Sequence, residues 1–282
     1  MASSSQFDGA TILHHVTNTR SDVWIPINLW GIDLSITKHV LMLWIVAVTV
    51  ISISVYATRA YRRSKDIKPK GIAHLFEILM EFIKSDIVIP NIGNKGSRTW
   101  TPLIATFFLF ILISNFIGMI PFFEKIHLIF PGVSGSATIT GNFTVTAALS
   151  MITFFAIIIA GTMKHGFIGH WKNMIPGGVP APVLIILIPI EIMGMFIKPA
   201  ALMLRLGANM TAGHIGLVAI FGIPMIIFQS TQSVGVGFSV AAVSVILNTA
   251  IYFLEIIVCL VQAYVFSLLS AVFIGMAIHA EH

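Results

Sequence analysis

The amino-acid sequence predicts an all-α, polytopic membrane protein with about five membrane crossings, the last two of which form a hairpin of very long, tilted helices. Among the 282 residues, 57% are hydrophobic and 10% are charged, whereas soluble domains carry about 25% charged residues. Apolar runs long enough to cross a bilayer, about 18 residues or more, recur along the chain. Lipid is therefore its main solvent, and we predict a single integral membrane domain over residues 1–282.

The first half of the chain holds three apolar runs of ordinary length. Residues 1–38 contain no basic segment followed by an apolar one, so we expect no cleaved signal peptide and place this segment outside the membrane. Residues 39–57, 103–120 and 143–163 each match one crossing. The first of these spans is expected to start membrane insertion.

Two later apolar runs, residues 182–228 and 234–278, each exceed forty residues. A continuous helix of that length measures about 60 Å, whereas the hydrocarbon layer is about 30 Å thick. A turn inside the second run is disfavoured because residues 238–276 contain no proline and a single glycine, Gly275. We therefore predict two very long tilted helices, joined by a turn at the uncharged residues 229–233.

Lysine and arginine residues are distributed unevenly over the loops. Nine of the sixteen lie in residues 59–98, and Lys164 and Lys172 follow the third span, whereas the loop between the second and third spans has only Lys125. Because cytoplasmic loops are rich in these residues, the N-terminus is predicted outside and the C-terminus in the cytoplasm. The concentration in one loop also argues against a folded basic face that binds nucleic acid.

The basic segment 59–98 contains apolar residues at helical spacing, which predicts an amphipathic helix along the cytoplasmic interface. Its basic cluster has two interpretations, an anchor that fixes the topology or a site for lipid or a protein partner. The apolar positions are Ile72, Leu75, Phe76, Leu79, Phe82 and Ile83, and the cluster is Arg62, Arg63, Lys65, Lys68 and Lys70.

Four charged residues, Glu191, Lys198, Arg205 and Glu255, lie within the two long apolar runs. A charge at the centre of a membrane helix costs about 2.5 to 3.5 kcal/mol on insertion scales. A chain that keeps four of them must supply partners, water or a function. The open alternative is a set of structural ion pairs between helices.

The spacing of these residues predicts two polar stripes. Glu191, Lys198 and Arg205 are seven residues apart, and Asn209 follows four later, so these side chains share one helix face. His214 is nine residues beyond Arg205 and points to the opposite side. On the last helix, Asn248, Glu255 and Gln262 also repeat every seven residues, with Tyr252 and Cys259 on the same face. We expect the two stripes to be buried against one another or around water.

Residues 204–214, Leu-Arg-Leu-Gly-Ala-Asn-Met-Thr-Ala-Gly-His, resemble the signature of the subunit a family of F-type ATP synthases. The resemblance includes Glu191 and Lys198 before this string, and Glu255 and Gln262 after it. It extends more weakly to Asn115, so it covers most of residues 100–278. The first hundred residues match the family in layout only.

The resemblance implies roles for individual residues. The essential arginine of the family corresponds to Arg205, with Asn209, Glu191 and Gln262 as polar neighbours. The paired titratable positions correspond to His214 and Glu255, in the order opposite to some members, which implies that the two face one another. Some members have an acidic residue in place of Gly118, so Asn115 and Glu124 remain as polar candidates in that region. With Lys198, the predicted ion-translocation residues are therefore Arg205, Asn209, His214, Glu191, Glu255, Gln262, Asn115 and Lys198.

The implied function is that of a proton-conducting stator subunit, which supplies two half-channels and faces a carboxylate of the rotor ring. Expected partners are the ring of c subunits, b-type peripheral stalk subunits, the rest of the F1Fo complex and the lipid bilayer, in a bacterial plasma membrane. No motif here binds ATP, so catalysis is expected on other chains. We predict no cofactor and no metal site, because His165 and His170 are poorly spaced and lack other ligands nearby.

A stand-alone ion-coupled secondary transporter is the alternative, with Glu191, Arg205 and Glu255 binding substrate and coupling ion. Such transporters usually contain internal repeats and interrupted helices in both halves. The first three spans carry no such charges and no repeat is evident, which favours the stator subunit. Whether the ion is H⁺ or Na⁺ depends largely on the ring.

Overall fold

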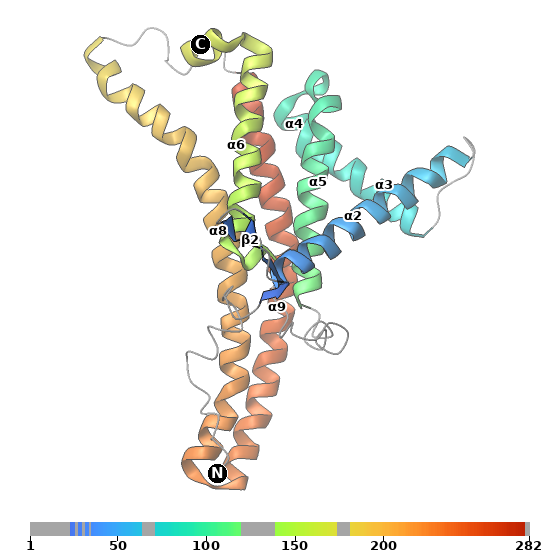
Figure 1. Ribbon diagram of the computed structural model, residues 1–282, viewed down its shortest axis with the longest axis vertical. Coiled ribbons are helices and arrows are strands. Elements are labelled where there is room, and N and C mark those ends of the chain that lie inside the picture. Colours follow the sequence, from blue (N-terminus) through green and yellow to red (C-terminus); the bar gives the residue numbers. More distant parts are fainter. Residues whose placement is uncertain are drawn as a thin grey trace. The chain divides into compact units, whose positions relative to one another are not determined.

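The computed structural model describes residues 23–25, 28–29, 32–33, 35–63, 71–119, 139–173 and 181–279 (Figure 1). Glu124 and most of the predicted outer segment 1–38 lie outside these residues. The helices are α2 (Lys38–Arg63), α3 (Ile72–Phe82), the π-helix η2 (Ile83–Val88), α4 (Ile89–Ile92), α5 (Asn94–Met119), the 3₁₀ helix η4 (Ile139–Gly141), α6 (Phe143–His165), α7 (Phe167–Asn173), α8 (Ala181–Thr231) and α9 (Val234–Ile278).

Five helices in the described part of the chain are long and apolar enough to cross a membrane. They are His39–Arg59, Asn94–Met119, Phe143–His165, Val183–Thr231 and Val234–Ile278. The last two contain 49 and 45 residues. The predicted all-α fold with five crossings and a long terminal pair is therefore confirmed.

In the described part of the chain, four short strands precede the first span, and they were not predicted. β1 (Val23–Ile25) pairs antiparallel with β4 (Ile36–Thr37), and β2 (Asn28–Leu29) pairs with β3 (Ile32–Asp33). β1 and β4 are rich in β-branched residues, which favour extended backbone. At two or three residues each, the strands were too short for periodicity to reveal.

The chain divides into two compact units. Unit 1 comprises Met1–Ile45, Ser114–Asn142 and Gly207–Val261, and unit 2 comprises Val46–Ile113, Phe143–Leu206 and Gln262–His282. Each unit draws on helices that are distant in the sequence. The two are described separately below.

In unit 1, the end of α8 and the beginning of α9 form a hairpin (Figure 1). The turn consists of Gln232 and Ser233, inside the predicted segment 229–233, and Gln232 has a positive φ of 52°. Gly237 closes the base of the hairpin, since a Cβ there would lie 3.1 Å from the ring of Phe228. The small residue lets the two helices approach closely beside the turn.

In unit 2, α5, α6 and α9 form a core of aromatic and small polar side chains. Phe107 of α5 meets Phe266 of α9 edge to face, with ring centroids 5.4 Å apart. The hydroxyls of Thr153 on α6 and Ser270 on α9 lie 3.2 Å apart and are buried. Gly275 of α9 packs against α4 so closely that a Cβ would overlap the carbonyl oxygen of Asn91. Small residues such as Gly275 let the helices of unit 2 approach closely, and the contact between the Thr153 and Ser270 hydroxyls links α6 to α9.

The helix predicted within residues 59–98 corresponds to α3 and η2. Ile72, Leu75 and Ile78 of α3 are more than half exposed, whereas Ile83 and Ile87 of η2 are fully buried. The ring of Phe82, at the end of α3, meets Phe108 edge to face and lies tilted against Tyr264, at centroid distances of 6.3 and 6.0 Å. The segment is therefore anchored in unit 2 through its second half, and α3 exposes apolar side chains.

Candidate functional site

The eight predicted site residues divide equally between the two units. Unit 1 contains Asn115, Asn209, His214 and Glu255, and unit 2 contains Glu191, Lys198, Arg205 and Gln262.

Glu255 is a buried carboxyl group in unit 1, only 3% exposed. It lies against the backbone of α8, where a Cβ added to Gly213 would be 2.8 Å from its Oε1 atom. Glycine at position 213 therefore makes the space for this side chain. Neither carboxyl oxygen has a hydrogen-bond partner among the described residues.

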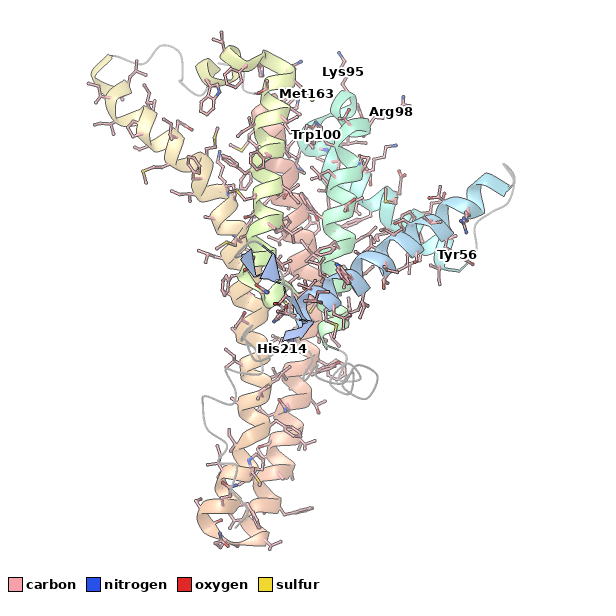
Figure 2. All side chains as sticks on the ribbon, viewed as in Figure 1. Tyr56, Lys95, Arg98, Trp100, Met163 and His214 are labelled. Atoms are coloured by element: carbon pink, nitrogen blue, oxygen red, sulfur yellow. The ribbon has the colours of Figure 1, made fainter. Side chains whose placement is uncertain are left out.

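His214 follows Gly213 and lies on α8 (Figure 2). Its Nε2 atom is buried and, within the described part of the chain, accepts or donates no hydrogen bond. Glu255 thus packs against Gly213, the residue that precedes His214, but its carboxyl group forms no hydrogen bond with the His214 ring. Buried polar atoms without partners are uncommon in folded proteins.

Asn115 connects three elements of unit 1 and is fully buried. Thr140 of η4 donates a hydrogen bond of 2.6 Å to its side-chain oxygen. Its amide group donates in turn to the backbone carbonyl of Cys259 on α9, at 3.3 Å. Two turns away, the Tyr252 hydroxyl donates to the carbonyl of Met119 at the end of α5, at 3.1 Å. The end of α5 is therefore held to α9 at two levels beside Glu255.

Arg205 and Glu191 are exposed on α8, in unit 2. The inward face of this part of α8 is formed by Leu202 and Leu206, which are 2% and 1% exposed. Among the described residues, no carboxylate lies within ion-pair distance of the Arg205 guanidinium. Arg205 therefore presents, on an exposed face of an apolar helix, a positive charge that no described residue pairs.

Lys198 and Gln262 differ from Arg205 in their surroundings within unit 2. The Lys198 ammonium lies 5.7 Å from the centroid of the Phe273 ring, a cation–π distance. Gln262 is 6% exposed and sits next to the fully buried Ala263. The Lys198 ammonium thus lies over the Phe273 ring, and Gln262 is on the buried side of α9.

The expectation that both polar stripes are buried holds only for part of the α9 stripe, in which Tyr252 is exposed and Asn248 is half-buried. Glu255, Cys259 and Gln262 are buried there, but Glu191, Arg205 and Asn209 on α8 are exposed within this chain. The physical reason is that α8 packs through its leucines and Met210, which leaves its polar face outward. The stripe of α8 is accessible to another molecule.

Sequence reasoning missed Thr140 and Gly213. Thr140 precedes a span by three residues and carries no charge, so nothing marked it as the partner of Asn115. Gly213 stands within the string that carries the family resemblance, but its use as a space for Glu255 depends on helix packing. Within the described residues, no group of three His, Cys, Asp or Glu could hold a metal ion.

Residues 40–275 match the ATP synthase A chain family. The chain belongs to this family. The match begins in α2, ends in α9 and includes all eight candidate residues of this subunit a.

Relatives named as ATP synthase subunit a align along nearly the whole chain. The protein of Chloroherpeton thalassium is 40% identical over 280 residues, which cover 96% of this chain and 77% of the relative. ATP synthase subunit a 2 of Chlorobium luteolum is 39% identical, over 95% of this chain and 75% of the relative. The protein of Myxococcus xanthus is 38% identical, over 89% and 75%. The chain is a multi-pass subunit of the membrane sector, with bacterial relatives.

Proposed function

We propose that the chain is the proton-conducting stator subunit of a rotary ATP synthase, with Arg205 facing the carboxylate of the rotor ring. The observation that carries the proposal is the exposed guanidinium on a helix of membrane length, which forms no ion pair with any residue that the structure describes. Arginine at the centre of a membrane helix costs about 2.5 to 3.5 kcal/mol on insertion scales, so its presence calls for a partner. A carboxylate on an adjacent subunit matches this charge.

The ring carboxylate must be neutral while it faces lipid, because an ionised group would cost several kcal/mol there. It must ionise elsewhere in the cycle to exchange its proton. Arg205, which is always charged, favours the ionised carboxylate as it passes. The same charge repels a proton that would move directly between the two half-channels, so rotation becomes the only route.

The buried polar residues of α9 and unit 1 would line the half-channels. Glu255 and His214 are assigned to proton exchange, because both carboxyl oxygens of Glu255 and the Nε2 atom of His214 are buried in unit 1 without hydrogen-bond partners among the described residues. Asn115 would position α5 against α9 beside Glu255. Glu191, Lys198, Asn209 and Gln262 are assigned to the polar path near Arg205. The opposing interpretation, a buried structural pair, predicts that replacing His214 and Glu255 by apolar residues leaves pumping unchanged.

The chain itself would be non-catalytic, with nucleotide chemistry on other subunits. Each elementary charge that crosses about 100 mV provides about 2.3 kcal/mol, which several steps per turn can accumulate. We assign c-ring and b-type stalk subunits as partners in a bacterial plasma membrane. The N-terminus would lie outside and the C-terminus in the cytoplasm.

Cross-linking tests whether the Arg205 face of α8 meets the ring. Leu204, 53% exposed, and Leu206, 1% exposed, flank Arg205 and form a matched pair for cysteine substitution in a Cys259→Ser background. With a second cysteine beside the ring carboxylate, Leu204→Cys is expected to form a disulfide in oxidised membranes and Leu206→Cys is not. Equal cross-linking of both, or of neither, would contradict the proposed interface.

A further inference from the structure

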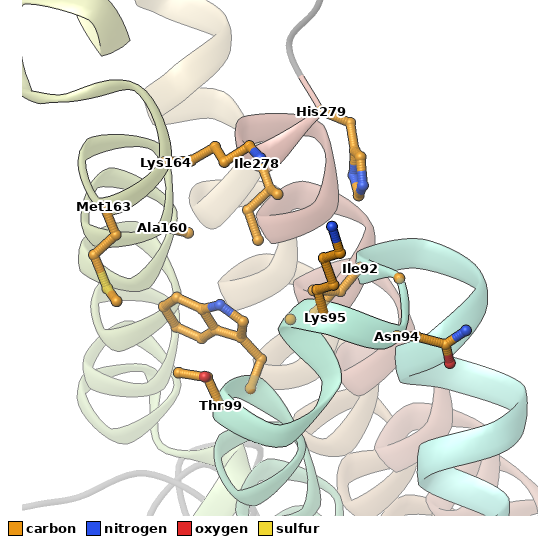
Figure 3. A pocket seen from close by; sticks show the side chains of 12 residues that line it. Ile92, Asn94, Lys95, Thr99, Ala160, Met163, Lys164, Ile278 and His279 are labelled. Carbon is orange, nitrogen blue, oxygen red and sulfur yellow. The ribbon is translucent and has the colours of Figure 1, made fainter.

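Unit 2 contains a pocket of about 430 Å³ that the ion path does not use. Its lining comes from α4 and the start of α5, the end of α6, and the end of α9. Figure 3 shows the Lys95 and Lys164 ammonium groups and the His279 ring around the same opening. The pocket therefore gathers three basic side chains from three segments that are far apart in the sequence.

Among the residues that the structure describes, no acidic side chain lines this pocket. In the described part of the chain, neither Lys95 nor Lys164 forms an ion pair. The apolar part of the lining includes Ile92, Met163 and the indole-bearing Trp100. The chemistry offered is thus positive charge at the opening beside an apolar wall.

The backbone around the pocket is fixed by close contacts. Gly93, with φ of 84°, adopts a conformation that other residues rarely take, and it places the loop between α4 and α5 next to His279. His279 donates from Nδ1 to the carbonyl of Gly275 at 3.0 Å, which directs its other nitrogen toward this loop. His165 donates to the carbonyl of Ile278 at 3.1 Å, which ties the end of α6 to the end of α9. The backbone segments that carry Lys95, Lys164 and His279 are therefore tied to one another.

Three candidate membrane spans begin or end at this pocket. Asn94–Met119 starts in its lining, Phe143–His165 ends next to Lys164, and Val234–Ile278 ends in its lining. Ends of spans lie at the boundary between hydrocarbon and water, where tryptophan and lysine side chains are typical. The pocket consequently faces the depth at which phospholipid headgroups lie.

We propose that this pocket binds a phosphate group, supplied by an anionic phospholipid headgroup or by free inorganic phosphate. Lysine ammonium groups bind phosphate as point charges, and basic pockets between membrane helices are suited to anionic headgroups. The apolar wall beside the charges fits an acyl chain. The pocket shares no residue with those assigned to ion transport, and the proposal does not rest on the proposed rotary function.

The test uses the full chain purified in detergent. Native mass spectrometry counts bound dioleoylphosphatidylglycerol or dioleoylphosphatidylcholine, and equilibrium dialysis measures radiolabelled inorganic phosphate. The double variant Lys95→Gln/Lys164→Gln is compared with Lys84→Gln/Arg98→Gln, which removes the same charge from exposed positions outside the pocket. Lys95→Arg/Lys164→Arg keeps the charge and serves as the rescue variant.

We expect the pocket variant to bind phosphatidylglycerol about thirtyfold more weakly than the control, the fold-change that corresponds to about 1 kcal/mol per basic residue. The arginine variant should retain binding. If the pocket variant loses binding of phosphatidylglycerol but not of phosphatidylcholine, and the unmodified chain binds no inorganic phosphate, the pocket is a lipid site. If the pocket variant loses binding of phosphatidylglycerol and of inorganic phosphate equally, and the two compete for the unmodified chain, the pocket is a phosphate site. Two results would overturn the proposal, each combined with phosphate binding that does not depend on the lysines. One is equal binding of phosphatidylglycerol by all variants, and the other is equal binding of phosphatidylglycerol and phosphatidylcholine by the unmodified chain. If the double variant fails to fold, the single variant Lys164→Gln at the exposed end of α6 gives the same comparison.

Discussion

Glu255 owes its position to a neighbour without a side chain. Its Oε1 atom lies 2.8 Å from the place where a Cβ at Gly213 would stand, and the side chain is buried within unit 1. Helical periodicity could predict that Glu255 shares a face with Cys259 and Gln262, because that depends only on the helix repeat. It could not predict the space at Gly213 or the Thr140 hydrogen bond to Asn115, which arise where distant segments pack.

Gly213→Ala is expected to slow ATP-driven proton pumping by about tenfold. The new methyl group would lie 2.8 Å from Glu255 Oε1, so the carboxyl group must move, and displacing a reacting group by about 1 Å can cost about 100-fold in rate. Pumping is measured by dye quenching in inverted vesicles. Gly216→Ala on the same helix, where a Cβ meets nothing within 4 Å, is the control and should pump normally. Equal rates for the two variants would show that the position of Glu255 is not critical.

The long helices α8 and α9 are the elements that sequence composition predicts best. The stretch from Phe238 to Met276 lacks proline, and the structure continues α9 through it without a break. The turn falls at Gln232 and Ser233, inside the segment expected from its polar, uncharged composition. Burial of the α8 stripe was wrongly expected, because a sequence pattern identifies a polar face but not the surface that the helix uses for packing.

Gly275→Ala is expected to destabilise unit 2 by about 1 to 3 kcal/mol, the usual cost of overpacking. A Cβ at this position would overlap the backbone carbonyl of Asn91, which cannot rotate away as a flexible side chain could. The change is measured as a lower midpoint of thermal unfolding in detergent. Gly194→Ala on α8 meets nothing within 4 Å and should leave the midpoint unchanged or raised. A Gly275→Ala midpoint equal to that of Gly194→Ala would mean that α4 and α9 are not tightly packed.

For the whole molecule, hydropathy predicts the number of crossings because each crossing needs a minimum apolar length. The division into two units could not be predicted, since its boundaries fall inside helices, as between Leu206 and Gly207 of α8. No periodicity changes at such a boundary. The family match across residues 40–275 shows that these crossings are those of an ATP synthase A chain.

The predicted orientation can be measured with cysteine labelling. Cys259 is the chain's single cysteine, so a Cys259→Ser background allows one exposed reporter at a time. Gln232→Cys, in the exposed turn between α8 and α9, should react with a membrane-impermeant maleimide in intact spheroplasts. Lys84→Cys, exposed in η2, should react only in inverted vesicles. The reverse pattern would place the basic segment 59–98 outside and overturn the topology.

ATP-driven proton pumping in inverted vesicles, with ATPase activity followed in parallel, tests the central claim about Arg205 most directly. Arg205→Ala should abolish pumping, because no fixed positive charge would then separate the half-channels or favour the ionised ring carboxylate. Lys84→Ala removes an exposed positive charge that is distant from Arg205 in the sequence, and this variant should pump as the unmodified chain does. Pumping by Arg205→Ala at the rate of the Lys84→Ala control would contradict the account and return the chain to a transporter or structural role.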